Sequence, residues 1–161
     1  MRKINSIIIH CAATPEGKDF TVADIDRWHK KRGWKGIGYH FVIYRDGSVH
    51  EGRPLAQAGA HCVGHNAESI GICYIGGVDA AGKPKDTRTP QQKEALVKLV
   101  AELRQKYNIS KQHIYGRQRV CTPWPELHHA GRNQPDRLPC AGQLLHRRRR
   151  ELRSDGYGSV G

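Results

Sequence analysis

The stretch INSIIIH, residues 4–10, predicts a buried strand that ends on a histidine. Its three consecutive isoleucines place β-branched side chains on both faces, as in an inner strand that is covered from both sides. His10 then lies at the carboxyl end of the strand, which is the edge where open α/β folds bind their ligands. The stretch therefore predicts an α/β fold with a candidate site at His10.

The following hundred residues alternate between helical and strand patterns. Thr21 and Thr89 can cap helices, and Asp46-Gly47 is a hairpin turn signal between two strand-like runs. We expect helices at residues 21–33 and 89–108, and further strands at 39–44, 49–52, 69–75 and 114–115. This interleaving predicts a mixed central β-sheet flanked by helices, in the α/β class.

Length and composition indicate one domain followed by a tail. A chain of 161 residues fits a single domain, and its 37% hydrophobic content is that of a soluble protein. Residues 1–116 carry the periodic patterns. Residues 117–161 have no sustained period, contain a run of four arginines at 147–150 and end in glycine and serine. We expect residues 117–161 to form a basic, poorly ordered tail.

Three blocks, in this order, resemble the type-2 N-acetylmuramoyl-L-alanine amidase family, which includes T7-type phage lysozymes and the peptidoglycan recognition proteins. The blocks are IIIHCAAT (7–14), GIGYHFVI (36–43), and GAHCVGHN (59–66) leading into SIGICYIGG (69–77). The resemblance covers residues 1–116. It implies the peptidoglycan-recognition/amidase fold and hydrolysis of the amide between N-acetylmuramic acid and the L-alanine of the stem peptide.

The resemblance also implies roles for individual residues. His10 matches the first zinc ligand, and Tyr39 matches a catalytic tyrosine whose hydroxyl can orient water or donate to the tetrahedral intermediate. His61 and Asn66 match the wall of the substrate groove, although a solvated loop with Asn66 in a turn is the alternative. For His65 the two interpretations are balanced. A Zn²⁺ with three protein ligands and an open fourth position would activate the water.

The second half of the metal site departs from the family. There, the strand matching 114–116 is followed at once by a second zinc histidine, and later by a Cys-Pro that supplies the third ligand. In this chain Arg117 follows instead. Arginine has no lone pair to offer a metal near neutral pH. One histidine by itself holds zinc poorly.

Two explanations stay open. In the first, His128 or His129 joins Cys121 or Cys140 in a rearranged site. In the second, which we favour, the reading frame has shifted near codon 117. Codons for residues 118–121, read one base later, can spell Asn-Glu-Phe-Ala, and those for 137–139 can spell Ala-Cys-Pro, as in the family. The nucleotide sequence tests this hypothesis, which fails if no single shift restores a histidine and a downstream Cys-Pro.

The leading function is thus a zinc hydrolase of the cell wall, and the alternative is an inactive peptidoglycan-binding module without a complete zinc site. The net charge of +12 suits any polyanion, but no nucleic-acid motif accompanies it. We expect peptidoglycan as the partner, no specific nucleic acid, no transmembrane segment and a monomer. The N-terminus shows no signal peptide. This predicts either an endolysin of a phage or prophage that stays cytoplasmic until a separate lysis system releases it, or an enzyme that acts on envelope fragments in the cytoplasm.

Overall fold

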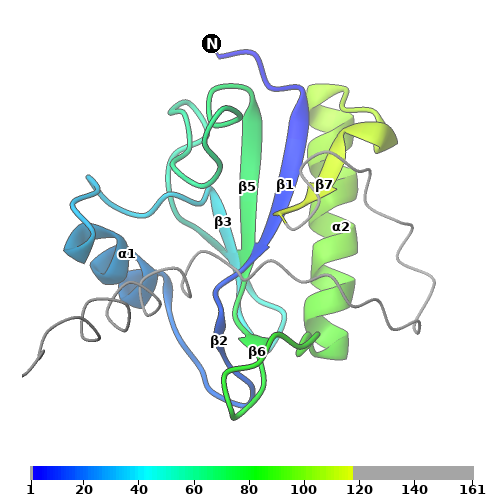
Figure 1. The fold of residues 1–161 in the computed structure, drawn as a ribbon. Coiled ribbons are helices and arrows are strands. Elements are labelled where there is room, and N and C mark those ends of the chain that lie inside the picture. The colour runs from blue at the N-terminus through cyan, green and yellow to red at the C-terminus, as the bar shows by residue number, and fades with distance from the viewer. Residues whose placement is uncertain (1, 118–161) are drawn as a thin grey trace, which may run out of the picture.

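The computed structural model describes residues 2–117, which form a five-stranded mixed sheet. Its strands are β1 (Ser6–Cys11), β3 (Phe41–Ile43), β4 (Val49–Glu51), β5 (Ser69–Tyr74) and β7 (Ile114–Gly116). The spatial order is β4-β3-β5-β1-β7, and every pair is parallel except the β3–β4 hairpin. Strand β1 therefore pairs on both edges, with β5 and with β7 (Figure 1).

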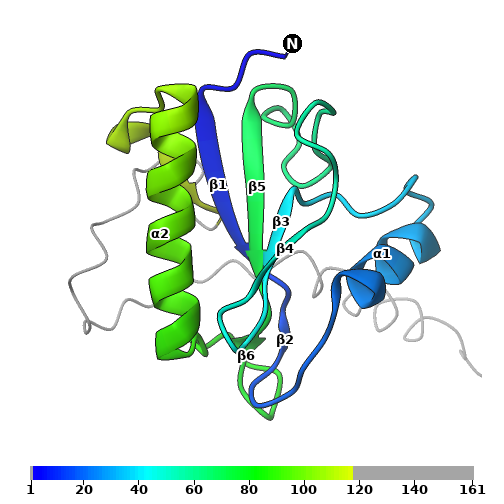
Figure 2. The ribbon, with the colours of Figure 1, turned by 180° about the vertical axis from the view of Figure 1, so that it is seen from behind.

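The two long helices, α1 (Val22–Lys31) and α2 (Pro90–Tyr107), begin at matching capping boxes. In each, a threonine hydroxyl accepts from the backbone N–H three residues on, and that residue's side chain accepts from the threonine N–H in return. Helix α2 ends at Asn108, whose left-handed backbone closes the last turn. A short 3₁₀ turn, η1 (Lys111–His113), leads into β7. Figure 2 shows α2 running along β1 and β5, with α1 set apart from it.

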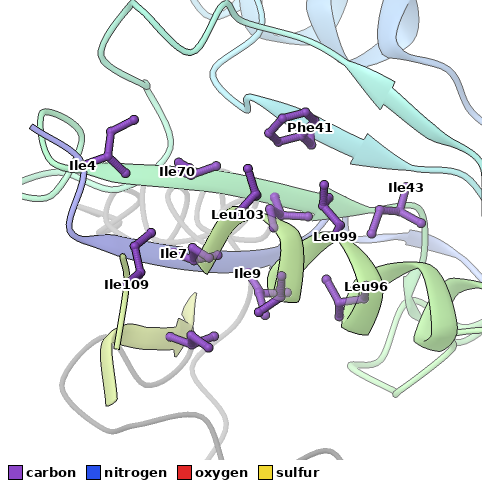
Figure 3. Packing of buried hydrophobic residues seen from close by; sticks show 13 residues of the cluster. Ile4, Ile7, Ile9, Phe41, Ile43, Ile70, Leu96, Leu99, Leu103 and Ile109 are labelled. Atoms are coloured by element: carbon purple, nitrogen blue, oxygen red, sulfur yellow. The ribbon is translucent and has the colours of Figure 1, made fainter. Parts of the chain in front are cut away.

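The core has two clusters, one for each face of the sheet. Ile7 and Ile9 of β1 belong to the larger cluster, which β3, β5 and β7 share with Leu96 and its neighbours on α2 (Figure 3). The smaller cluster contains Cys73 and is joined by residues of α1. Because His10 is the register partner of Cys73 and side chains alternate along a strand, His10 points to the face opposite α2.

The expected α/β class, the mixed sheet and both helices are confirmed. The strands differ in their ends: residues 39 and 40 precede β3, and β1 continues through Cys11. A second sheet of β2 (Thr14–Pro15) and β6 (Gly77–Val78) was not expected from the sequence, because two-residue strands carry no periodic pattern. Within residues 2–117, no helix is both long and apolar enough to span a bilayer. The expected tail lies almost wholly outside the described residues.

Helix α2 offers a matched pair of substitutions that tests the larger core cluster. Leu96 is fully buried against the sheet, whereas Val97, the next residue, is 46% exposed. We expect Leu96→Ala to lower the free energy of unfolding by about 2–5 kcal/mol, because it leaves a cavity. Val97→Ala should change it by about 0.5 kcal/mol or less. Urea unfolding followed by circular dichroism measures both, and equal effects would contradict the packing described.

Candidate functional site

His10 is the buried centre of a cluster of aromatic side chains at the carboxyl end of β1. Its side chain is 1% exposed. Its Nε2 lies 3.0 Å from Nδ1 of His61, while its Nδ1 is buried and has no hydrogen-bond partner among the described residues. A buried ring nitrogen without a partner costs free energy unless a ligand or a metal completes it. Nδ1 of His10 is thus left able to accept a hydrogen bond or to bind a metal.

Tyr39 packs beside His10 from the segment that enters β3. The ring centroids of the two residues are 5.1 Å apart, and the ring of His29 lies 5.4 Å from Tyr39. His29 comes from α1, and its Nδ1 accepts a 3.0 Å hydrogen bond from the backbone N–H of Gly38. This bond ties α1 to the residue just before Tyr39. Helix α1 therefore helps to hold Tyr39 against the end of β1.

A loop preceding β5 brings His61 to the site. Gly38 allows the close approach, because a Cβ atom there would lie 2.1 Å from the carbonyl oxygen of Ala60. Asn66 Oδ1 accepts hydrogen bonds from the backbone N–H groups of His61 (2.8 Å) and Cys62 (2.9 Å), which closes the loop on itself. The loop is thus fixed at both ends. Asn66 Oδ1 is thus used within the loop, as expected for an asparagine in a turn.

The imidazole of His61 is enclosed. It is 6% exposed, and its Nε2 lies 3.3 Å from the hydroxyl of Ser69 at the start of β5. Both of its ring nitrogens are therefore engaged, one by His10 and one by Ser69. Contact of His61 and Asn66 with a substrate stays a prediction. His65, the third candidate of this loop, has an exposed side chain.

Burial keeps the histidines of this region neutral. Desolvation lowers the pKa of His61 to about 3, with the neighbouring His40 adding to the effect. Desolvation likewise lowers the pKa of His29 to about 4, and that of His40 to about 4 despite the Gln57 carbonyl, which raises it. The pKa of His10 falls well below its ordinary value, first through burial and then through His61. At neutral pH these rings act as hydrogen-bond partners or ligands, not as cations.

Arg117 is the residue that follows β7, at the same end of the sheet as His10. Gly116 pairs with Ile9, so the next residue of each strand lies at the same edge. Its positive charge helps to lower the pKa values of both His10 and His61. From residue 2 to residue 117, no three histidine, cysteine or acidic side chains gather closely enough to hold a metal ion. His10 fits one zinc ligand, and the described residues do not provide the other two.

Three contributors to the site were not assigned a role from the sequence. In the sequence, His29, His40 and Ser69 belong to runs that predict only a helix, a hairpin strand and a further strand. In the structure, His29 is buried beside Tyr39 and His40 beside His61, with ring centroids 5.4 Å apart for the first pair and 5.8 Å for the second. The signal available for His29 was its position four residues after Ile25, which places both side chains on the buried face of α1. The candidates Cys121, His128, His129 and Cys140 lie outside the described residues.

Comparisons with known proteins identify the family and agree with the fold. A family model described as Amidase_2, N-acetylmuramoyl-L-alanine amidase, matches residues 1–141. The endolysin of Klebsiella phage KP32 is 43% identical over 106 residues, which are 66% of this chain and 70% of that endolysin. The amidase LysC from Clostridium intestinale URNW is similar in structure, with 36% identity and a TM-score of 0.63 over 74% of this chain and 73% of LysC. A mutant of Drosophila PGRP-LB in complex with tracheal cytotoxin gives 27% identity and a TM-score of 0.62, over 74% and 73% of the two chains.

The lowered pKa values predict a loss of stability in mild acid. In the unfolded chain these histidines titrate near pH 6.5. Below that pH the unfolded state therefore binds more protons than the folded state does. We expect the free energy of unfolding to be highest above pH 6.5 and to fall as the pH decreases towards about 4. Urea unfolding at pH 7, 6 and 5 measures this slope.

A pair of variants assigns that slope to buried rings. His29→Gln should flatten the pH dependence, because it removes one depressed group. His113→Gln, which replaces an exposed histidine of η1, should leave the slope as it is. An unchanged slope in His29→Gln would contradict the assignment.

Proposed function

Because the chain belongs to the N-acetylmuramoyl-L-alanine amidase family, we propose that it cleaves the amide between N-acetylmuramic acid and the L-alanine of the stem peptide at the His10–Tyr39 site. One observation carries this placement. Buried Nδ1 of His10 lacks a hydrogen-bond partner among the described residues, and the ring of Tyr39 lies beside it. In such an arrangement Nδ1 can still accept a bond from one more chemical group.

Hydrolysis of an amide needs an activated water and a group that stabilises the oxyanion of the tetrahedral intermediate. Tyr39 is suited to the second task or to orienting the water, since a phenol can donate and accept a hydrogen bond. Its place is set on both sides, by His10 and by His29. Such preorganisation is what makes a donor effective in a buried site.

Zinc enters this proposal through His10. A bound Zn²⁺ would supply the Lewis acid that lowers the pKa of the attacking water. Its further ligands would have to come from beyond residue 117, where Cys121, His128, His129 and Cys140 carry suitable donor atoms. Arg117, at the end of β7, supplies no ligand.

A second candidate function follows from Arg117 itself. A guanidinium beside His10 disfavours a second cation at the same place, since like charges repel strongly in a buried setting. Without the metal, the chain would keep the groove of the amidase fold and bind peptidoglycan without cutting it. The two candidates differ in metal content and in the release of stem peptides.

Relatives suggest the setting of either function. The similar phage protein is an endolysin, and one similar structure holds tracheal cytotoxin. We propose peptidoglycan as the partner and an endolysin-like action on the cell wall after release, as a monomer and without a specific nucleic-acid partner. The basic charge of the chain would favour an anionic envelope.

The zinc content and the activity of the unaltered chain, compared with those of His10→Ala, decide between the two candidates. We expect the purified full chain, after zinc loading and desalting, to carry one zinc ion and to release stem peptides from purified peptidoglycan. His10→Ala should lose both properties, whereas His113→Ala should keep both. Elemental analysis and the appearance of new L-alanine amino termini are the measurements. A metal-free, inactive chain that still pellets with peptidoglycan would establish the binding module instead.

Tyr39→Phe tests the hydroxyl group. We expect the rate of stem-peptide release to fall by about 10²–10³-fold, the usual effect of removing one oxyanion donor. Pelleting with peptidoglycan should be unchanged, because the ring stays in place. Tyr107→Phe, at the end of α2, is the control and should retain full activity. A Tyr39→Phe variant with unchanged rate would remove Tyr39 from the mechanism.

A further inference from the structure

A line of buried hydrogen bonds connects the backbone of the loop before β5 to His10. It runs from the carbonyl oxygen of His65 through the hydroxyl of Ser69 and the ring of His61 to Nε2 of His10. Its three links measure 2.6, 3.3 and 3.0 Å. Every side chain in this line is buried, so water does not compete for the bonds.

The first link sets a direction. A carbonyl oxygen can only accept, so the single hydrogen of the Ser69 hydroxyl points at His65. The Ser69 oxygen then has only lone pairs left for its second neighbour, Nε2 of His61. That nitrogen must therefore carry the proton and donate it to Ser69.

The proton on Nε2 of His61 also determines which ring donates in the contact between His61 and His10. Protonation of His61 at both ring nitrogens would place a charge on a ring that is 6% exposed and has no acidic partner among its printed contacts. In the neutral ring, a proton on Nε2 leaves a lone pair on Nδ1. Nε2 of His10 must then be the donor across the 3.0 Å contact.

Two glycines leave the space that the His61 ring occupies. A Cβ atom at Gly59 would lie 2.3 Å from Cδ2 of His61, and one at Gly71 would lie 2.5 Å from the same atom. Any larger residue at either position would push the ring aside. The backbone N–H of His61 is held in turn by Asn66. The ring therefore has one place in which both of its nitrogens are bonded.

We infer that Ser69 and His61 are positioning residues that fix His10 in its Nε2–H tautomer, so that a lone pair on Nδ1 is presented to whatever group completes the site. In the opposite tautomer, Nδ1 would carry a buried hydrogen without an acceptor, and the contact with His61 would join two lone pairs. This line of hydrogen bonds makes Nδ1 of His10 an acceptor or a metal ligand before anything binds. Its use in hydrolysis rests on the proposed function, but the tautomer itself does not.

NMR of the ring nitrogens of His10 and His61, on the full chain without metal, tests the direction of these hydrogen bonds. In ¹⁵N-labelled protein treated with EDTA at pH 7, protonated and bare ring nitrogens resonate at well-separated shifts. We expect His10 and His61 each to show a single tautomer with the proton on Nε2. A ¹⁵N–¹⁵N coupling across the contact between the two rings, with the proton attached to His10, should report the direction of that bond.

Ser69→Ala supplies the variant, and Ser6→Ala is its matched control. Ser6 is the register partner of Ser69 on β1 and is also buried, but its hydroxyl contacts the Glu68 carbonyl and no histidine. Ser69→Ala should convert the single tautomers of His10 and His61 into mixtures, and Ser6→Ala should preserve them.

Two results would overturn the inference: a proton on Nδ1 of His10 in the unaltered chain, or tautomers in folded Ser69→Ala identical to those of the unaltered chain. If Ser69→Ala does not fold, the tautomers and the coupling in the unaltered chain decide. Because metal and substrate are absent, the outcome is independent of hydrolysis. An inactive chain with the expected tautomers would refute only the proposed function.

Discussion

The parallel pairing of β1 with β5 on one side and β7 on the other is the constraint on which the remaining structure depends. It buries β1 along both edges, while α2 covers Ile7 and Ile9 on one face. A strand in this position can carry apolar side chains on both faces, and the three consecutive isoleucines of β1 do so. The pairing brings the carboxyl ends of three strands together at His10. Every other group of the site is placed with reference to that end.

The side chains buried around His10 include three histidines that stay neutral at pH 7 and form hydrogen bonds, not ion pairs. His29 and His40 each accept a backbone N–H through Nδ1, from Gly38 and from Gly71. Through these bonds, His29 connects α1 to the segment that enters β3, and His40 connects the same segment to β5. The cost is a set of groups that must stay unprotonated for the fold to hold, since protonation would break each acceptor. A site of this kind suits ligation and hydrogen bonding near neutral pH.

The end of β7 is where we expect this chain to depart from the pattern of its family. Arg117 stands beside His10 and brings a positive charge to a place where an imidazole would bring a lone pair. The hydrogen bonds that orient His10 come from the opposite direction, through β5 and its preceding loop. The orienting half of the site is therefore complete within residues 2–117, whatever the residues beyond it contribute.

Sequence alone was sufficient for the α/β class, the two capped helices and the place of His10 at a strand end. These features depend on local patterns: a β-branched run, a threonine with a capping partner three residues on, and an Asp-Gly turn. The ordered blocks of the amidase family added Tyr39 and His61. Only the tertiary structure decided that His61 bonds His10 and Ser69, and that His29 packs on Tyr39. Those contacts join residues far apart in the chain, and a histidine looks the same in a sequence whether it faces water, a backbone amide or another ring.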